Sequence, residues 1–178
     1  PFVYIISDVV TEVYGYVIAR KILWYTIIAQ VLAVLVFQFV VVYPPAIVFE
    51  GNDAFSMVLS AAPKLVFFGT IAVFAGDIAN NYVLAKMKLW LKGKQMALRF
   101  VASTFVGQLV NTAVFYCFGL WGILPFDHMI ESILIASLAK IIVEVVMLPF
   151  TVFVTAKVKK IEGVDVFDKN TDFNPLKF

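Results

Sequence analysis

The chain has 178 residues, of which 62% are hydrophobic and 15% charged, and its mean hydropathy is +0.96. A soluble domain has about 45–50% apolar and about 25% charged residues, so this composition excludes a soluble globular protein and predicts an all-α, polytopic bundle of transmembrane helices. The net charge of +2 gives no indication of nucleic-acid binding, and the lone Cys117 excludes a disulfide framework.

Five segments are long and apolar enough, or nearly so, to cross about 30 Å of hydrocarbon as helices. They are residues 1–18, 22–43, 63–84, 97–120 and 132–156. Pro44 and Pro45 end the second segment, because proline cannot continue the helical hydrogen bonds, and residues 50–53 are expected to form a solvated turn. Residues 1–156 are therefore the predicted transmembrane domain. Residues 157–178 form a polar tail that we expect to be solvated and partly mobile.

Basic residues alternate between the connections of these segments. Arg20 and Lys21 follow the first segment, residues 85–99 contain five Lys and Arg, and residues 157–160 contain three Lys. The connections at 44–62 and 121–131 contain none. Because cytoplasmic loops are enriched in Lys and Arg, this pattern predicts a multi-pass membrane protein with a cytoplasmic C-terminus. The first segment then enters from outside, which predicts one more helix upstream and six in the full-length protein.

Ionisable residues inside these segments are costly in lipid and often mark a transport pathway. Asp8 and Glu12 lie four residues apart on one helix face, where they could capture a substrate or a proton, or could pair with bases from other helices. Lys140 and Glu144 have the same spacing. They could neutralise each other within one helix, or they could contact a substrate or relay a proton.

Amide side chains occur near the middle of the third and fourth segments. FAGDIANNY contains Asp77 and Asn80, and STFVGQLVNT contains Gln108 and Asn111. Asparagines can join neighbouring helices, whereas the donors and acceptors of Gln108 and Asn111 also suit the edge of a base. Gly107 directly precedes Gln108, and a residue this small favours close packing of helices.

The third and fourth segments share a short pattern of residues. Phe74, Gly76, Asn80 and Val83 recur 31 residues later as Phe105, Gly107, Asn111 and Val114. Consecutive spans run in opposite directions, so a true repeat would be of the inverted kind that many transporters contain, although four matches can also arise by chance.

The sequence contains no catalytic triad, phosphate-binding glycine loop or paired-cysteine site, so we expect neither an enzyme nor a self-contained ATP-driven pump, and no cofactor. His128 has acidic neighbours but no second histidine, and we expect no metal site.

Four motifs carry a resemblance to a known family. They are PFVYIISDVVTEVYGYVIARKILW, FAGDIANNYVLAKMK, STFVGQLVNTAVFY and SLAKIIVEVVMLPFTVFV. From Pro1 to about Lys160 the chain resembles the queuosine precursor transporters of the vitamin uptake transporter group. The resemblance implies a six-helix importer of 7-deazaguanine-type bases in the bacterial inner membrane. It also implies substrate-binding roles for Asp8, Glu12, Asp77, Asn80, Gln108, Asn111, Lys140 and Glu144.

Three classes of function follow from these observations. The leading hypothesis is a stand-alone secondary transporter that binds a purine-like substrate between helices in the lipid bilayer, with proton coupling as an option. The alternative is a substrate-binding membrane subunit of an ATP-energised uptake system for vitamins or nucleobases. The third is a membrane scaffold whose polar residues only join helices. The sequence indicates no oligomeric state.

Overall fold

A computed structural model describes residues 2–45, 51–120 and 125–177 of the protein. The helices are α1 (Phe2–Tyr14), α2 (Tyr16–Val42), α3 (Asn52–Trp90), α4 (Met96–Val114) with a π-helical turn at Phe115–Gly119, and α5 (Phe126–Glu162). The predicted all-α bundle is confirmed. Over the described residues, α2, α3, α4 with its π-helical turn, and α5 are each long and apolar enough to cross a membrane. The described part of α1 has 13 residues and extends about 20 Å.

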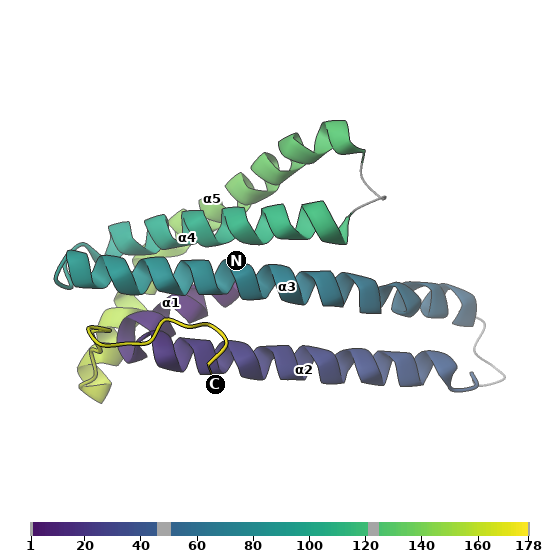
Figure 1. The fold of residues 1–178 in the computed structure, drawn as a ribbon, viewed down its shortest axis with the longest axis horizontal. Coiled ribbons are helices and arrows are strands. Elements are labelled where there is room, and N and C mark those ends of the chain that lie inside the picture. The colour runs from purple at the N-terminus through teal and green to yellow at the C-terminus, as the bar shows by residue number, and fades with distance from the viewer. Residues whose placement is uncertain (1, 46–50, 121–124, 178) are drawn as a thin grey trace.

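The helices pack into a bundle (Figure 1), and many of the side chains buried in it are polar or charged. α3 and α4 form a hairpin with the largest interhelical contact, α5 packs against α4, and α2 packs against α3. The short α1 packs against α2, α3 and α5, on the side of the bundle where the C-terminal tail also lies. Outward-facing side chains of α2, such as Val31, Leu35 and Phe39, are apolar and exposed, as expected of a surface that contacts lipid.

The largest difference from the predicted boundaries concerns α3. This helix begins at Asn52 and continues through Pro63, so residues 52–62, which were predicted to belong to the connection between two segments, are helical. Helices in membranes tolerate an internal proline because neighbouring groups satisfy the freed carbonyl. α2 begins at Tyr16 and α5 continues to Glu162, beyond the predicted segments. Hydropathy marks the part of a helix that lies in hydrocarbon and misses the polar turns that extend it.

Two glycines permit the close approach of α3 and α4. A Cβ atom built on Gly76 would lie 2.6 Å from Asn111 Cβ, and one built on Gly107 would lie 2.7 Å from Asn80 Cβ. Neither position can therefore accept a side chain without movement of the helices, and the predicted packing role of Gly107 is confirmed. The contact is reciprocal, because each glycine meets the asparagine four residues beyond the other glycine. The pattern shared by the two segments thus corresponds to a crossing with local two-fold symmetry.

The C-terminal tail packs against the junction of α1 and α2. Gly15 separates these helices with a φ of +83°, and a Cβ atom there would lie 2.8 Å from Val166 Cγ1. The Val166 amide donates to the Val13 carbonyl at 3.0 Å. The Asp168 carboxylate, which is buried, accepts a hydrogen bond from the Tyr16 amide at 3.1 Å. Asp168 thus caps the N-terminus of α2 from a distant part of the chain.

Further contacts hold the end of the tail along α2. Its backbone carbonyls accept hydrogen bonds from the side chains of Tyr16, Arg20 and Trp24. The ring of Phe173 lies 4.9 Å from that of Tyr16 and 5.3 Å from that of Tyr82, between centroids. Most residues of the tail are exposed, as the sequence suggested, but the tail also makes specific contacts with α2. Polar composition alone does not reveal that its carbonyls accept hydrogen bonds from side chains of α2.

Replacing Asp168 with alanine should lower the free energy of unfolding by about 1 kcal/mol, because the change removes the acceptor that caps α2. A lower midpoint of thermal unfolding in detergent would report this loss. Asp172→Ala is the matched control, since the exposed Asp172 carboxylate accepts bonds from Asn174 and Lys177 of the tail itself. Equal midpoints for the two variants would contradict the capping role.

Candidate functional site

Polar residues inside the bundle form three successive layers, and α1, α3, α4 and α5 contribute to each of them. The cavity layer contains Tyr4, Asp77, Gln108, Asn111 and Lys140. The carboxyl layer contains Asp8, Asn80, Thr104 and Glu144. The ion cluster contains Glu12, Lys88, Arg99 and Lys159, with Asp165 from the tail. In every one of these helices the residues follow this order toward the end of the bundle where the tail lies.

The cavity layer surrounds a cavity of about 380 Å³, a volume within the range of small-molecule sites. Most of the residues that line it lie on α1 and α2, and the majority of these are apolar. The polar part of the wall includes four residues that the sequence predicted for substrate binding, namely Asp77, Gln108, Asn111 and Lys140. The structure therefore brings residues from three different helices to one void.

Several polar atoms of the cavity layer lack a hydrogen-bond partner within the described part of the chain. They are Tyr4 Oη, Asp77 Oδ1 and both the Oε1 and Nε2 atoms of Gln108. Gln108 is only 1% exposed and Asp77 6%. Buried polar groups are nearly always bonded, and leaving one unbonded costs about 1–3 kcal/mol. These atoms therefore mark a place where a ligand or water would supply the missing bonds.

Lys140 directs its ammonium group toward the cavity. Its Nζ donates to Asn111 Oδ1 and to Thr112 Oγ1, each at 3.2 Å. The ion pairs of the described side chains include none between Lys140 and Glu144. The sequence left two roles open for Lys140 and Glu144, and the ion pair that would neutralise both charges within α5 is not formed. The two side chains belong to different layers.

The carboxyl layer lies next to the cavity but does not line it. Asp8, which is fully buried, accepts a hydrogen bond from Asn80 Nδ2 at 2.7 Å and one from Thr104 Oγ1 at 3.3 Å. The buried carboxyl group of Glu144 faces Asp8 from α5. Asp8, Asn80 and Glu144, for which the resemblance implied substrate-binding roles, do not line this cavity and lie next to it.

Glu12 is the centre of the ion cluster. Both terminal nitrogens of Arg99 donate to its carboxylate, Lys159 Nζ lies 2.6 Å from Oε1, and Lys88 Nζ lies 3.7 Å from the same atom. Glu12 and Arg99 are both 0% exposed. Glu12 therefore does not form a like-charge pair with Asp8. Its carboxylate meets basic side chains from three other helices. This is the second of the two roles considered from the sequence, in which Glu12 pairs with basic residues of other helices.

Asp165 extends this cluster into the tail. Its Oδ1 lies 2.6 Å from Lys88 Nζ and 2.7 Å from Lys159 Nζ. Partial burial acts to raise its pKa, but the hydrogen bonds and charges of the two lysines hold the pKa of Asp165 below its ordinary value. Asp165 is therefore ionised at neutral pH. Together with Glu12 it balances the positive charges of Lys88 and Lys159.

Sequence reasoning missed several residues of the three layers. They are Tyr4, Lys88, Arg99, Thr104 and Lys159. One signal was available, because Tyr4 precedes Asp8 by four residues and Thr104 precedes Gln108 by four, which puts each on a helix face already known to be polar. Lys88, Arg99 and Lys159 had been interpreted only as positive charge at the cytoplasmic ends of helices. Their contacts with Glu12 were therefore not predicted.

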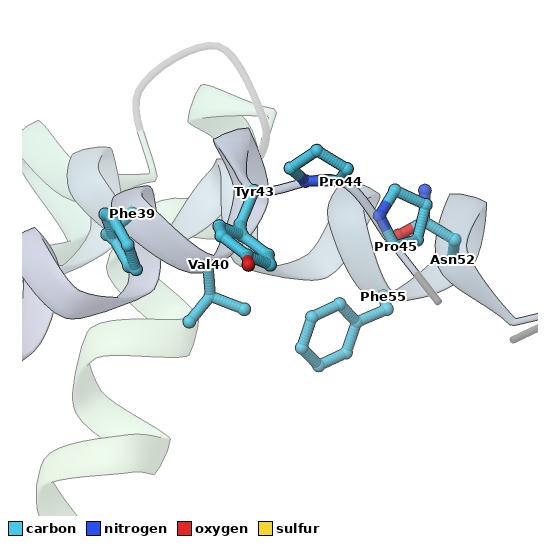
Figure 2. A pocket seen from close by; sticks show the side chains of 7 residues that line it. All are labelled: Phe39, Val40, Tyr43, Pro44, Pro45, Asn52 and Phe55. Carbon is cyan, nitrogen blue, oxygen red and sulfur yellow. The ribbon is translucent and has the colours of Figure 1, made fainter. Parts of the chain in front are cut away.

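A second hollow lies at the far end of the bundle, between the end of α2 and the start of α3 (Figure 2). Its volume is about 230 Å³, and it is lined by Phe39, Val40, Tyr43, Pro44, Pro45, Asn52 and Phe55. None of these lining residues is charged, and all lie far along α2 and α3 from the three layers. The cavity next to Asp77 and Gln108 is therefore the candidate site.

Replacing Glu12 with glutamine should reduce stability by about 3–5 kcal/mol, because it leaves Arg99 buried without its counter-charge. Thermal unfolding in detergent and the amount of folded protein in membranes measure this loss. Glu131→Gln removes the same charge at an exposed position of α5 and serves as the control. If Glu12→Gln were as stable as the control yet failed to bind substrate, Glu12 would belong to the substrate site after all.

Comparison with known proteins agrees with this architecture. The family described as "Putative vitamin uptake transporter" matches residues 1–154. One relative is the "Probable queuosine precursor transporter" of Bacillus subtilis (strain 168), which is 25% identical over 149 residues. The alignment covers 83% of this chain and 65% of that protein, so the chain spans less than two thirds of its relative's length. No solved structure matches the chain. The family match includes all residues of the cavity and carboxyl layers, and the chain therefore belongs to the vitamin uptake transporter family of multi-pass membrane proteins.

Proposed function

We propose that the protein imports a purine-like base, a queuosine precursor of the 7-deazaguanine type, across the bacterial inner membrane as a stand-alone secondary transporter. The observation that carries this proposal is the cavity of about 380 Å³ with its unbonded, buried polar atoms on Asp77, Gln108 and Tyr4. Membership of the family and the printed name of the Bacillus relative support the class of substrate.

The chemistry of the cavity suits such a base. A guanine-like edge presents a ring N–H and an exocyclic amine, which are adjacent donors, beside a carbonyl acceptor. The carboxylate of Asp77 can accept from the donors, the ammonium of Lys140 can donate to the carbonyl, and the Gln108 amide can do either. The apolar wall formed by α1 and α2 suits the faces of a flat ring.

The eight predicted site residues take three different roles in this proposal. Asp77, Gln108, Asn111 and Lys140 contact the substrate. The residues of the carboxyl layer, Asp8, Asn80 and Glu144, act behind them, and Glu12 holds the helices around the site. This division follows the positions of the three layers.

The distribution of basic side chains indicates the orientation of the protein in the membrane. Arg20, Lys88, Arg99 and Lys159 all contact the tail or the ion cluster at one end of the bundle. The predicted connections at the other end contain no Lys or Arg. Under the positive-inside rule this distribution supports a cytoplasmic location for the ion cluster and the C-terminus. Substrate arriving from outside then reaches the cavity layer before it meets the ion cluster.

Asp77→Asn should weaken substrate binding by about ten- to hundredfold, which corresponds to about 1.5–3 kcal/mol for a hydrogen bond that involves a charged group. Gln108→Leu should weaken it by about two- to tenfold, which corresponds to about 0.5–1.5 kcal/mol for a hydrogen bond of the neutral amide. Uptake of a labelled 7-deazaguanine base should fall accordingly in proteoliposomes that contain only this protein and no ATP. Gln108→Leu should not lower thermal stability, because it removes two unbonded polar atoms from the interior.

Matched controls lie outside the cavity. Asp53→Asn changes an exposed carboxylate in the first turn of α3, and Gln38→Leu changes an amide on α2 that does not line the cavity. Both control variants should take up the base like the unchanged protein. Uptake that is equal in all four variants would remove Asp77 and Gln108 from the site, and a requirement for ATP would contradict the stand-alone mechanism.

A further inference from the structure

Two carboxyl groups meet in the carboxyl layer, and neither pairs with a basic side chain of the described residues. Asp8 on α1 and Glu144 on α5 are both fully buried, and their carboxyl groups face each other beside Thr104. The ion pairs found over the described residues involve neither of them. Two negative charges so close together, in an interior that excludes water, repel each other strongly.

The charged groups nearest to this pair are engaged elsewhere. On α1, Glu12 is held by the ion cluster, and on α5 the ammonium of Lys140 is bonded to Asn111 and Thr112. The side chains that face Asp8 from α3 and α4 are the neutral donors Asn80 and Thr104. Asp77 and Tyr4, the remaining titratable neighbours, lie in the cavity layer. No fixed positive charge in the described interior therefore neutralises the pair.

Unpartnered atoms show what the pair lacks. Both Oε atoms of Glu144 and Oδ1 of Asn80 are buried without a hydrogen-bond partner in the described chain. A single proton shared by the two carboxyl groups supplies the donor that Glu144 lacks and removes the repulsion from Asp8. A metal cation would need several oxygens directed at one point, whereas Asn80 directs its nitrogen toward Asp8 and Thr104 its hydroxyl hydrogen. The donor set around Asp8 thus fits a proton and not a metal ion.

We propose that the Asp8 and Glu144 carboxyl groups form a proton-binding site, distinct from the substrate cavity, and that the proton bound there drives uptake. The coupling, unlike the protonation, rests on the proposed transport function. Both helices also line the cavity, because Tyr4 precedes Asp8 and Lys140 precedes Glu144 by one helical turn. A shared proton draws α1 and α5 together at the cavity, and its loss drives them apart. One proton enters from outside with each substrate and leaves on the cytoplasmic side, and no covalent bond of the substrate changes.

The first test is independent of transport. Infrared spectroscopy of the purified protein should show the carbonyl band of a protonated carboxylic acid at neutral pH. This band should be lost in both Asp8→Asn and Glu144→Gln, whose amides can donate the hydrogen bond that the proton otherwise provides. It should persist in Glu131→Gln, which changes an exposed carboxylate on the same helix as Glu144. Absence of the band from the unchanged protein, or its persistence in both pair variants, would overturn the proton site.

The second test measures coupling in proteoliposomes with a labelled 7-deazaguanine base. An inward proton gradient should drive accumulation by the unchanged protein and by Glu131→Gln. In Glu144→Gln, accumulation should fall to the level seen without a gradient, while exchange of labelled for unlabelled base continues. Proton-driven accumulation by Glu144→Gln, or accumulation driven only by sodium, would overturn the coupling.

The two proposals fail in different ways. If the infrared band behaves as expected but the unchanged protein neither exchanges nor accumulates the base, the proposed substrate is wrong and the proton site stands. If exchange proceeds and the band is absent, the transport function stands and the proton site is wrong.

Discussion

The buried carboxylate of Glu12 connects most of the molecule. It accepts hydrogen bonds from Arg99 on α4 and Lys159 on α5, and Lys88 on α3 donates to its backbone carbonyl at 2.5 Å. Helices in lipid gain no hydrophobic energy from associating, so close packing and polar contacts must hold them. Because a buried charge without its partner is strongly destabilising, each base requires Glu12 as much as Glu12 requires the bases. Asp165 joins the tail to the same charges.

This cluster also fixes the position of α1 along the bundle. With Glu12 held, Asp8 lies one turn away and Tyr4 two turns away, which places them at the carboxyl layer and the cavity layer. The close approach of α3 and α4 at Gly76 and Gly107 fixes these two helices against each other, because their backbones are in direct contact there. Asp77, Gln108 and Asn111 in the wall of the cavity therefore lie on this hairpin, whereas most of the apolar lining comes from α1 and α2. Rigid polar groups around a void favour selective recognition of one arrangement of donors and acceptors.

Hydropathy and charge were sufficient to predict the helical bundle and the gathering of Arg and Lys at one end. Helical spacing was sufficient to single out Asp77, Gln108, Asn111 and Lys140, which do line one cavity. It could not separate them from Asp8, Asn80 and Glu144, because an inward face of a helix passes through all three layers. The partners of Glu12 lie 76 to 147 residues away along the chain, so no local pattern indicates them. For the same reason the ordered course of the tail was not predicted.

The contact between Asp168 and the start of α2 has a consequence for biogenesis. Residues 164–175 follow α5, so they leave the ribosome after that helix has been synthesised. Until then the Tyr16 amide and the Arg20 guanidinium lack the acceptors that they have in the finished structure. The contacts around the junction of α1 and α2 are thus completed only after α5 has been synthesised. A nascent chain stalled before this segment would contain α1 to α5 and still be recognisable to quality-control proteases by its open junction at Gly15.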